Sequence, residues 1–271
     1  MTNPHADAVV AAPRTRPEPT DRQHHTAYLL SLGDDALVYA QRLGTWIAHA
    51  PQIEEDMALG NVALDLLGQA RSLLTRAGEV QGEGRDEDAL AMLRDEREFR
   101  NVQLVEQPRG DFGQEMARML WFASYQLELW TRLTGSADET LAGIAQKAVK
   151  EAAYHRDHAT QWVLRLGDGT QQSHARMQAG LVAVHPYVAE LGEDHDAARW
   201  AAGAGIGVLP SGLADAVNDH VARVLEQATL TMPDPPRWHA RGGREGIHSE
   251  AMGYLLAEMQ HIARSHPGAT W

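Results

Sequence analysis

Apolar residues recur every three or four positions along most of this 271-residue chain, and this spacing constrains the fold more than any other feature. The pattern is clearest in two stretches: Leu37, Ala40, Leu43 and Ile47, then Met57, Val62, Leu66, Ala70 and Leu73. Such spacing places apolar side chains on one face of an α-helix, whereas a half-buried strand alternates with period two. Because no segment shows a strand pattern, the sequence predicts an all-α, up-and-down helical bundle.

Capping and helix-breaking residues predict where the helices begin and end. Asp34 is expected to cap a helix that runs to Ala50 and stops at Pro51. The acids at 54–56 suit the first turn of a second helix, because the helix dipole favours anions there, and Gly78 is expected to close it. Further helices are expected over 116–133 behind the capping residues 111–114, from 136–139 to 167, over 170–191 with Pro186 bending or ending it, over 212–229 and over 247–265.

The composition excludes several classes of function. The chain has no cysteine, which rules out disulfides, thiolate metal sites and cysteine nucleophiles. With 24 Lys and Arg against 37 Asp and Glu, the formal charge of −13 disfavours nucleic-acid and anionic-membrane partners. There is neither an apolar run of membrane-spanning length nor a secretory pattern, so we expect a cytoplasmic protein. The prolines at 4, 13, 17 and 19 predict a disordered tail over residues 1–23.

The segment from Arg85 to Arg100 is dense in charges of both signs. We expect a solvated helix there, supported by pairs of opposite charge four residues apart. The alternative interpretation is a salt-bridged contact with another subunit.

A helical bundle rich in acids and histidines raises the question of a carboxylate-bridged di-iron site. Such a site needs four acids and two histidines pointing inward from four helices, with Glu-x-x-His on two of them. Glu245 with His248 and Glu258 with His261 have this spacing, but chance alone produces about as many matches. We therefore expect both pairs on a solvated helix face.

The central part of the chain places Glu151, His155 and His158 on one helix face. The favoured interpretation is a buried histidine that is hydrogen-bonded to Glu151. The alternative is a weak metal site, to which Asp65 would add a further ligand. The chain contains no Gly-x-Gly-x-x-Gly, Walker loop or Gly-x-Ser-x-Gly, and its seven tryptophans are expected mainly in the core.

Several longer motifs resemble one family. They are Leu32–Leu37, Glu54–Asp56, Ala63–Arg71, Gly84–Asp88, Leu93–Asn101, Leu104–Pro108, Arg165–Thr170, Gly242–Gly246, His248–Glu250, Leu255–Gln260 and Pro267–Trp271. From about residue 26 to the end, the chain resembles the C-subunit family of phenylacetyl-CoA epoxidase, the phenylacetic acid degradation protein PaaC family. Only the proline-rich tail lies outside the resemblance.

The resemblance implies a single ferritin-like helical domain over 24–271 and membership of a bacterial multicomponent monooxygenase. That enzyme epoxidises the aromatic ring of phenylacetyl-CoA with dioxygen and electrons from a separate reductase. In the family, a related A subunit carries the di-iron centre and the substrate, and the C subunit supports it structurally. The implied partners are therefore the A subunit, the other subunits and the reductase, with self-association when the chain is alone.

The resemblance also implies that this chain has lost metal ligands. Where the catalytic relative carries one Glu-x-x-His, this chain offers Leu66 and Gln69, and where it carries the other, Ala152 and His155. Because Leu66 and Ala152 have no donor atoms, we expect no catalytic residue and no metal or cofactor here, with Glu151 and His155 as remnants of the site.

The residues expected at the subunit interface lie in the charged segment and the C-terminal helix. They are Arg94, Glu96, Arg97, Arg100, Glu250 and Glu258. Two alternatives remain open: a metal-binding oxygenase subunit with its own degenerate site at Glu151, His155 and His158, and an acidic surface that docks the reductase.

Overall fold

A computed structural model describes residues 19–269, and within this range the chain is helical and contains no strand. The all-α prediction is confirmed. The α-helices are α1 (Asp21–Gly44), α2 (Ile53–Gln81), α3 (Glu87–Met92), α4 (Gln103–Glu106), α5 (Phe112–Leu133), α6 (Glu139–Gly167), α7 (Gln171–Val184), α8 (Asp196–Gly203), α9 (Ala214–Gln227) and α10 (Glu250–Ser265). The 3₁₀ turns are η1 (Glu96–Glu98), η2 (His185–Tyr187), η3 (Ala189–Gly192), η4 (Pro210–Leu213) and η5 (Gly243–Glu245).

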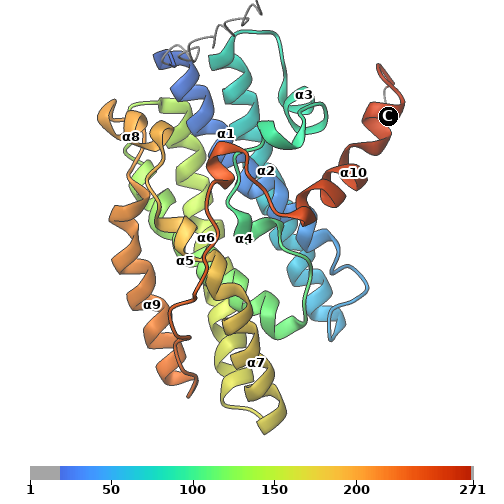
Figure 1. Ribbon diagram of the computed structural model, residues 1–271, viewed down its shortest axis with the longest axis vertical. Helices are drawn as coiled ribbons and strands as arrows, with labels where there is room; N and C mark the ends of the chain where they lie inside the picture. The colour runs from blue at the N-terminus through green and yellow to red at the C-terminus, as the bar shows by residue number, and fades with distance from the viewer. Residues whose placement is uncertain (1–18, 270–271) are drawn as a thin grey trace, which may run out of the picture.

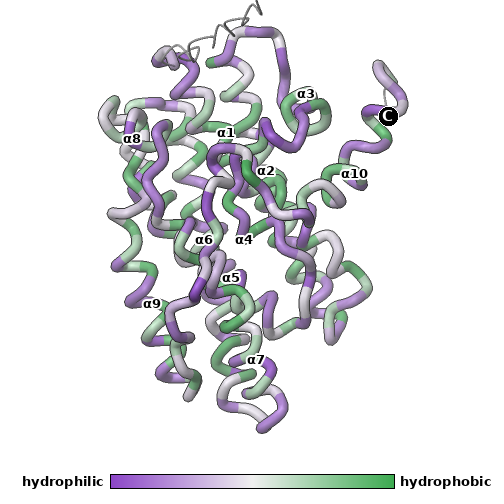
Figure 2. Tube along the Cα trace, in the orientation of Figure 1, coloured by the Kyte–Doolittle hydropathy of each residue, from purple (hydrophilic) through white to green (hydrophobic). Residues whose placement is uncertain are grey.

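Four long helices form the body of the bundle, an arrangement consistent with a ferritin-like fold (Figure 1). α1 packs on α2, α5 packs on α6, and α2 and α6 meet between the two pairs. α7 and α9 pack against α5 and α6, whereas α10 projects from the body and contacts mainly α3, α4 and α1. In Figure 2, hydrophobic and hydrophilic positions alternate in short runs along each long helix, as expected for helices with one buried face.

The core is centred on α5, which is buried on nearly every side. Residues 115–126 of this helix are all buried, which is unusual for a helix at a bundle surface and typical of a central one. The ring of Tyr39 on α1 lies edge-on to Phe122, with the ring centroids 5.0 Å apart. Glu115 accepts hydrogen bonds from Tyr39 Oη (2.8 Å) and Trp46 Nε1 (3.0 Å), so this buried acid joins α1 to α5.

The first helix starts earlier than the sequence predicts. Thr20 and Gln23 form a capping box, and α1 runs from Asp21 to Gly44, so the prediction that Asp34 is an N-cap is wrong. Asp34 instead lies fully buried in the middle of the helix. Of the expected tail, residues 1–18 lie outside the described range, whereas residues 21–23 form the first turn of α1.

Two of the predicted helix ends are also wrong. α1 ends at Gly44 and not at Ala50, and Gly78 lies inside α2, which ends at Gln81 with Gly82 as its left-handed C-cap.

Other boundaries follow the sequence. Asp111 caps α5 as expected, and Pro186 ends the helix that begins after Thr170, since α7 stops at Val184 and continues as η2. At the start of α6 the cap is Asp138, whose carboxylate accepts from the Thr140 and Leu141 amides. Ser136, expected to open this capping box, instead donates to the Ile206 carbonyl (2.6 Å).

The segment from Arg85 to Arg100 is not a solvated helix. It contains the short α3 and η1, and the Arg94 side chain is only 2% exposed. Both guanidinium Nη atoms of Arg94 donate to the Asp34 carboxylate, with Nη1 2.9 Å from Oδ2. The amide of Arg100 donates to the same Oδ2 at 2.8 Å. Asp34 therefore holds this segment against the middle of α1.

The neighbouring carboxylate, Asp35, has a second arginine. Arg244 in η5 donates to Asp35 through Nη1 (3.0 Å) and Nη2 (2.8 Å), and the Val102 amide donates to Oδ1 at 2.8 Å. Burial opposes the charge of Arg244, but the Asp35 carboxylate outweighs it and raises the Arg244 pKa. Two adjacent buried acids thus fix two loop segments that are far apart in the sequence.

Two further buried acids complete this polar network. Glu106 accepts from Asn101 Nδ2 (2.9 Å), His248 Nδ1 (2.8 Å) and the Ser249 amide (2.5 Å). His248, expected on a solvated face, is therefore buried: burial disfavours its protonation, but the Glu106 hydrogen bond outweighs this and raises its pKa.

Glu190 lies between the same two loop segments. It accepts from the amides of Gln103 (2.6 Å) and Gly243 (2.7 Å). Burial raises the Glu190 pKa to about 7, although both amide hydrogen bonds act in the opposite direction. A side chain on Gly243 would collide with the Asn101 carbonyl, so glycine permits this close approach of the two backbones.

The buried pair of Asp35 and Arg244 predicts a large loss of stability when one partner is removed. Arg244→Met leaves the Asp35 charge buried with one amide donor, and we expect the free energy of unfolding to fall by about 3–5 kcal/mol. Urea denaturation of the full chain measures this loss. The exposed Arg199, paired with Asp196, is the matched control, since Arg199→Met should change the free energy by less than about 1 kcal/mol. Equal effects of the two substitutions would contradict this role for Arg244.

Candidate functional site

The contact between α2 and α6 contains the residues that sequence analysis linked to metal chemistry. α6 presents a buried stripe in which four of seven side chains are alanines: Leu141, Ala145, Ala148, Ala152, His155, Ala159 and Val163. This spacing of three and four residues keeps the stripe on one face, and alanines let the two helices approach closely. His155 lies within this stripe and is 1% exposed. It is thus buried because of its position in the helix repeat.

His155 is paired with an acid from the opposite helix. Its Nε2 lies 3.1 Å from Oδ2 of Asp65 on α2. The prediction that His155 is hydrogen-bonded to Glu151 is wrong, because His155 bonds to Asp65 and Glu151 bonds to Gln69.

Glu151 is held by two other polar groups. Gln69 Nε2 on α2 donates to Oε2 at 2.9 Å, and Lys147 Nζ lies 3.1 Å from Oε1. The Gln69 amide therefore binds the Glu151 carboxylate across the helix contact. Both carboxylate oxygens of Glu151 are therefore bound by side chains of this chain.

His158 forms a third cross-helix pair, one turn further along α6. Its Nε2 lies 3.2 Å from Oε2 of Glu55 on α2. The exposed ring of Tyr154 stacks on His158 with the ring centroids 6.2 Å apart and an interplanar angle of 30°. Glu151, His155 and His158 share a face of α6, but each is paired with a different residue of α2.

These contacts do not make a di-iron site. Leu66 and Ala152 are both fully buried at this helix contact, and neither has an atom that can bind a metal. Within residues 19–269, no group of three or more His, Asp or Glu side chains is arranged to hold a metal ion. The donor set therefore does not fit the carboxylate-bridged iron pair that the ferritin-like architecture can carry.

Burial sets the charge of the two histidines. It lowers the pKa of His155, against the opposing effects of the hydrogen bond to Asp65 and of the Asp65 charge. It also lowers the pKa of His158, where Glu55 acts in the opposite direction. The two histidines differ in their hydrogen bonding: Nε2 of His155 is bonded to Asp65, whereas Nε2 of His158 and Oε2 of Glu55 lie 3.2 Å apart without the geometry of a hydrogen bond.

The residues expected at a subunit interface differ in how far they are buried. Arg94 is buried against Asp34, so the prediction that it contacts another subunit is wrong. Arg100 is half-buried, and its Nη1 donates to the Arg97 and Phe99 carbonyls. The remaining residues are exposed on η1 and α10 and stay predictions: Glu96, Arg97, Glu250 and Glu258.

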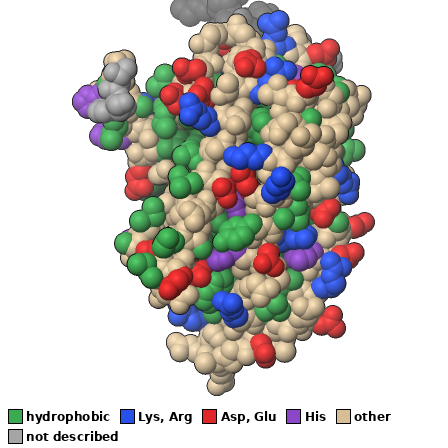
Figure 3. All heavy atoms as spheres, turned by 180° about the vertical axis from the view of Figure 1, so that it is seen from behind, with side chains coloured by type: hydrophobic (Ala, Val, Ile, Leu, Met, Phe, Trp, Pro, Cys, Tyr) green, Lys and Arg blue, Asp and Glu red, His purple; other side chains and the backbone are tan. Residues whose placement is uncertain are grey.

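Sequence analysis missed an exposed apolar surface along α2. Met57 and Ile47, expected in the core, are 65% and 62% exposed, and Ile53, Leu64 and Leu67 are exposed beside them. We call these five residues the α2 apolar face. All of its members except Ile47 lie on α2. There they are offset around the helix from the core residues Val62 and Leu66, so α2 has two apolar stripes. Figure 3 shows hydrophobic side chains gathered on the rear of the molecule, on the side of the projecting C-terminal helix.

The all-helical bundle, in which α2 and α6 place acids and histidines against one another, is consistent with the class of ferritin-like helical proteins. A family model described as phenylacetic acid catabolic protein matches residues 1–271, and the chain belongs to this family. It is also similar to the curated C subunit of 1,2-phenylacetyl-CoA epoxidase from Escherichia coli strain K12. The two are 45% identical over 246 residues, which cover 91% of this chain and 98% of the relative.

None of the helices in residues 19–269 is both long enough and apolar enough to cross a membrane. The family assignment expected from the sequence motifs is confirmed.

The buried histidine and the buried glutamate predict opposite effects on the pH dependence of stability. The pKa of His155 is below its ordinary value of 6.5, so the unfolded chain binds this proton more readily and stability falls as the pH drops below 6.5. The pKa of Glu190 is raised from 4.5 to about 7, so the folded chain retains its proton and stability falls as the pH rises through this range.

Urea denaturation at several pH values between 5 and 6.5 tests both directions. His155→Gln should make the free energy of unfolding rise less steeply with pH, and Glu190→Gln should make it rise more steeply. A full difference of one proton corresponds to about 1.4 kcal/mol per pH unit, which bounds each change in slope. A change of the same sign in both variants would contradict the assignment.

Proposed function

We propose that this chain is a non-catalytic structural subunit of a phenylacetyl-CoA epoxidase and that it stabilises a di-iron catalytic A subunit in the cytoplasm. The similarity to the Escherichia coli protein supports this proposal, because that relative is named as the C subunit of the epoxidase and is matched over nearly its whole length. The observation that carries the non-catalytic role is the α2–α6 contact. There, buried Leu66 and Ala152 have no donor atoms, and Glu151 and His155 are bound by Gln69 and Asp65.

The α2 apolar face supports a role in binding another helical subunit. It borders a groove of about 540 Å³ between α1 and α2, which Leu37 and Ala40 also line. Gly60 lies within this groove, and a Cβ atom added there would meet no other atom within 4 Å. A partner helix can therefore approach α2 closely. Exposed apolar stripes of this kind are typical of protein–protein contacts.

The charge of the chain suits such an apolar contact. The formal charge is −13, and like charges disfavour the pairing of two copies. A different subunit with an apolar helix face would cover the stripe without this cost. When the chain is expressed without a partner, we expect the burial of this stripe to outweigh the repulsion and to produce self-association.

The alternative is a metal-binding oxygenase subunit that uses Glu151, His155 and His158. Asp65, which lies 3.1 Å from His155, would join these ligands, but Glu151 would first have to release Gln69 and Lys147. The observed pairs therefore favour the structural role.

Co-expression with the catalytic subunit tests this proposal. Met57→Glu combined with Leu64→Glu places two charges on the α2 apolar face, and we expect the catalytic subunit to be lost from a purification that otherwise yields equal amounts. Burying an unpaired charge at an interface costs several kcal/mol, which is enough to abolish a stable complex. Because both side chains are exposed, the variant alone should unfold at the temperature of the unaltered chain.

Val182→Glu is the matched control, since Val182 is an exposed apolar residue on α7. It should leave co-purification unchanged. Equal recovery of the catalytic subunit with the α2 variant would contradict binding through α2. A catalytic subunit that is folded and fully active with its reductase in the absence of this chain would contradict the structural role itself.

A further inference from the structure

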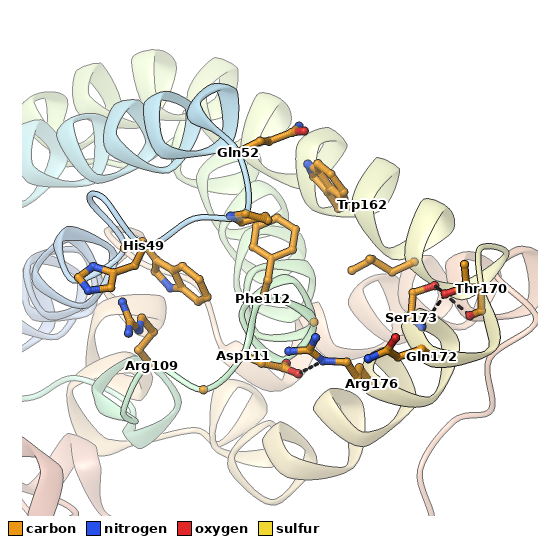
Figure 4. A pocket seen from close by; sticks show the side chains of 15 residues that line it. His49, Gln52, Arg109, Asp111, Phe112, Trp162, Thr170, Gln172, Ser173 and Arg176 are labelled. Carbon is orange, nitrogen blue, oxygen red and sulfur yellow. Dashed lines mark hydrogen bonds and ion pairs between the residues drawn. The ribbon is translucent and has the colours of Figure 1, made fainter.

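A cavity of about 550 Å³ opens where the first turns of three helices meet, beside the ends of α2 and α6 that carry the Glu55 and His158 pair (Figure 4). α2, α5 and α7 each begin beside it, at Gln52, Asp111 and Thr170. Its volume lies within the range of about 300–1,000 Å³ typical of pockets for small molecules. No step of the proposed structural role uses this cavity.

Aromatic rings form one wall of the cavity. The ring centroid of Phe112 lies 5.9 Å from that of Trp46 and 5.0 Å from that of Trp162, and Figure 4 shows Phe112 beside Trp162. Both contacts are edge-to-face, at interplanar angles of 81° and 88°. Trp46 is buried, whereas Phe112 and Trp162 are only partly covered. The wall therefore offers aromatic surface on which a further planar ring can pack.

Two arginines with unused donors also line the cavity. Arg109 lies over the Trp46 ring at 5.2 Å and donates from Nη1 to the Thr45 carbonyl at 2.8 Å. Arg176 donates from Nε to Asp111 Oδ2 at 2.8 Å. The other guanidinium N–H groups of both arginines have no hydrogen-bond partner among the described residues. Each side chain is thus anchored at one nitrogen and can donate to a ligand with the others.

The electrostatics of the lining favour an anion. Of the described residues that line the cavity, only Asp111 is acidic, and its two oxygens are taken by the Gln114 amide and Arg176. His49 adds a further polar ring at the rim. The N-termini of α5 and α7 contribute positive potential, whereas Glu54, Glu55 and Asp56 in the first turn of α2 offset that of the third helix. Such a lining is unexpected in a chain with a formal charge of −13.

We propose that this cavity binds a small molecule in which a planar aromatic ring is joined to a carboxylate or phosphate. The ring packs against Phe112 and Trp162, and the anionic group accepts hydrogen bonds from Arg109 and Arg176. Two kinds of molecule share this chemistry: an aryl carboxylate and a nucleotide. The inference rests on the cavity alone and does not depend on the proposed structural role.

Isothermal titration calorimetry of the purified full chain tests the inference with four probes. Phenylacetate represents an aryl carboxylate and adenosine monophosphate a nucleotide. Phenylacetamide, which lacks the charge, and inorganic phosphate, which lacks the ring, are the matched controls. We expect saturable 1:1 binding of at least one aromatic anion, and about tenfold weaker binding of its control. The stronger of the two aromatic anions identifies the kind of ligand.

Substitutions then place the ligand in the cavity. Arg109→Gln and Arg176→Gln should each weaken binding about tenfold, as expected for the loss of one charge-assisted hydrogen bond. Trp162→Leu removes an aromatic ring without altering any charge and should weaken binding independently. Arg199→Gln, on the distant α8, should leave binding unchanged (Figure 1). Thermal unfolding of each variant without ligand verifies that it is folded.

The inference is overturned if neither aromatic anion binds, or if phenylacetamide and phosphate bind as tightly as the aromatic anions. It is also overturned if folded Arg109, Arg176 and Trp162 variants bind like the unaltered chain. Should one arginine variant fail to fold, the other arginine variant and Trp162→Leu still decide the question.

Discussion

The fold depends on two adjacent carboxylates, Asp34 and Asp35, buried in the middle of α1. A buried charge is strongly unfavourable unless a partner of opposite charge and further hydrogen bonds compensate for it. Arg94 and Arg244 supply these partners from loop segments far along the chain. The backbone amides of Arg100 and Val102 complete the two sites. One dipeptide thus fixes the position of two loop segments that cover the bundle, and through them the base of α10.

The α2–α6 contact follows the same rule of internal compensation. A ferritin-like bundle can gather acids and histidines around two metal ions, whose positive charge then balances the carboxylates. Here Asp65 lies against His155, Glu55 against His158 and Glu151 against Gln69 and Lys147, so these acids have partners from the chain itself. Leucine and alanine fill the positions between them.

Helical periodicity predicted the all-α fold and most helix ends, because that pattern is local and depends on a single face per helix. It failed where long-range contacts decide. Asp34 has the local features of an N-cap, and only Arg94, 60 residues away, explains its burial. Met57 belongs to a regular apolar stripe, but α2 has two such stripes and the sequence does not tell which one faces the core. The family resemblance, not the periodicity, singled out Leu66, Gln69 and Ala152, which lie at the α2–α6 contact. The partner of His155 depended on the relative register of two helices, which single-sequence patterns do not encode.

Iron analysis of the purified full chain, after incubation with excess ferrous iron and removal of unbound metal, tests the central claim most directly. That claim is that the acids and histidines of this bundle bind one another instead of a metal pair. The account predicts that this chain binds no stoichiometric iron, either when it is purified alone or when it is part of the complex. Binding of about two irons per chain, lost on substitution of Glu151 or His155, would contradict it.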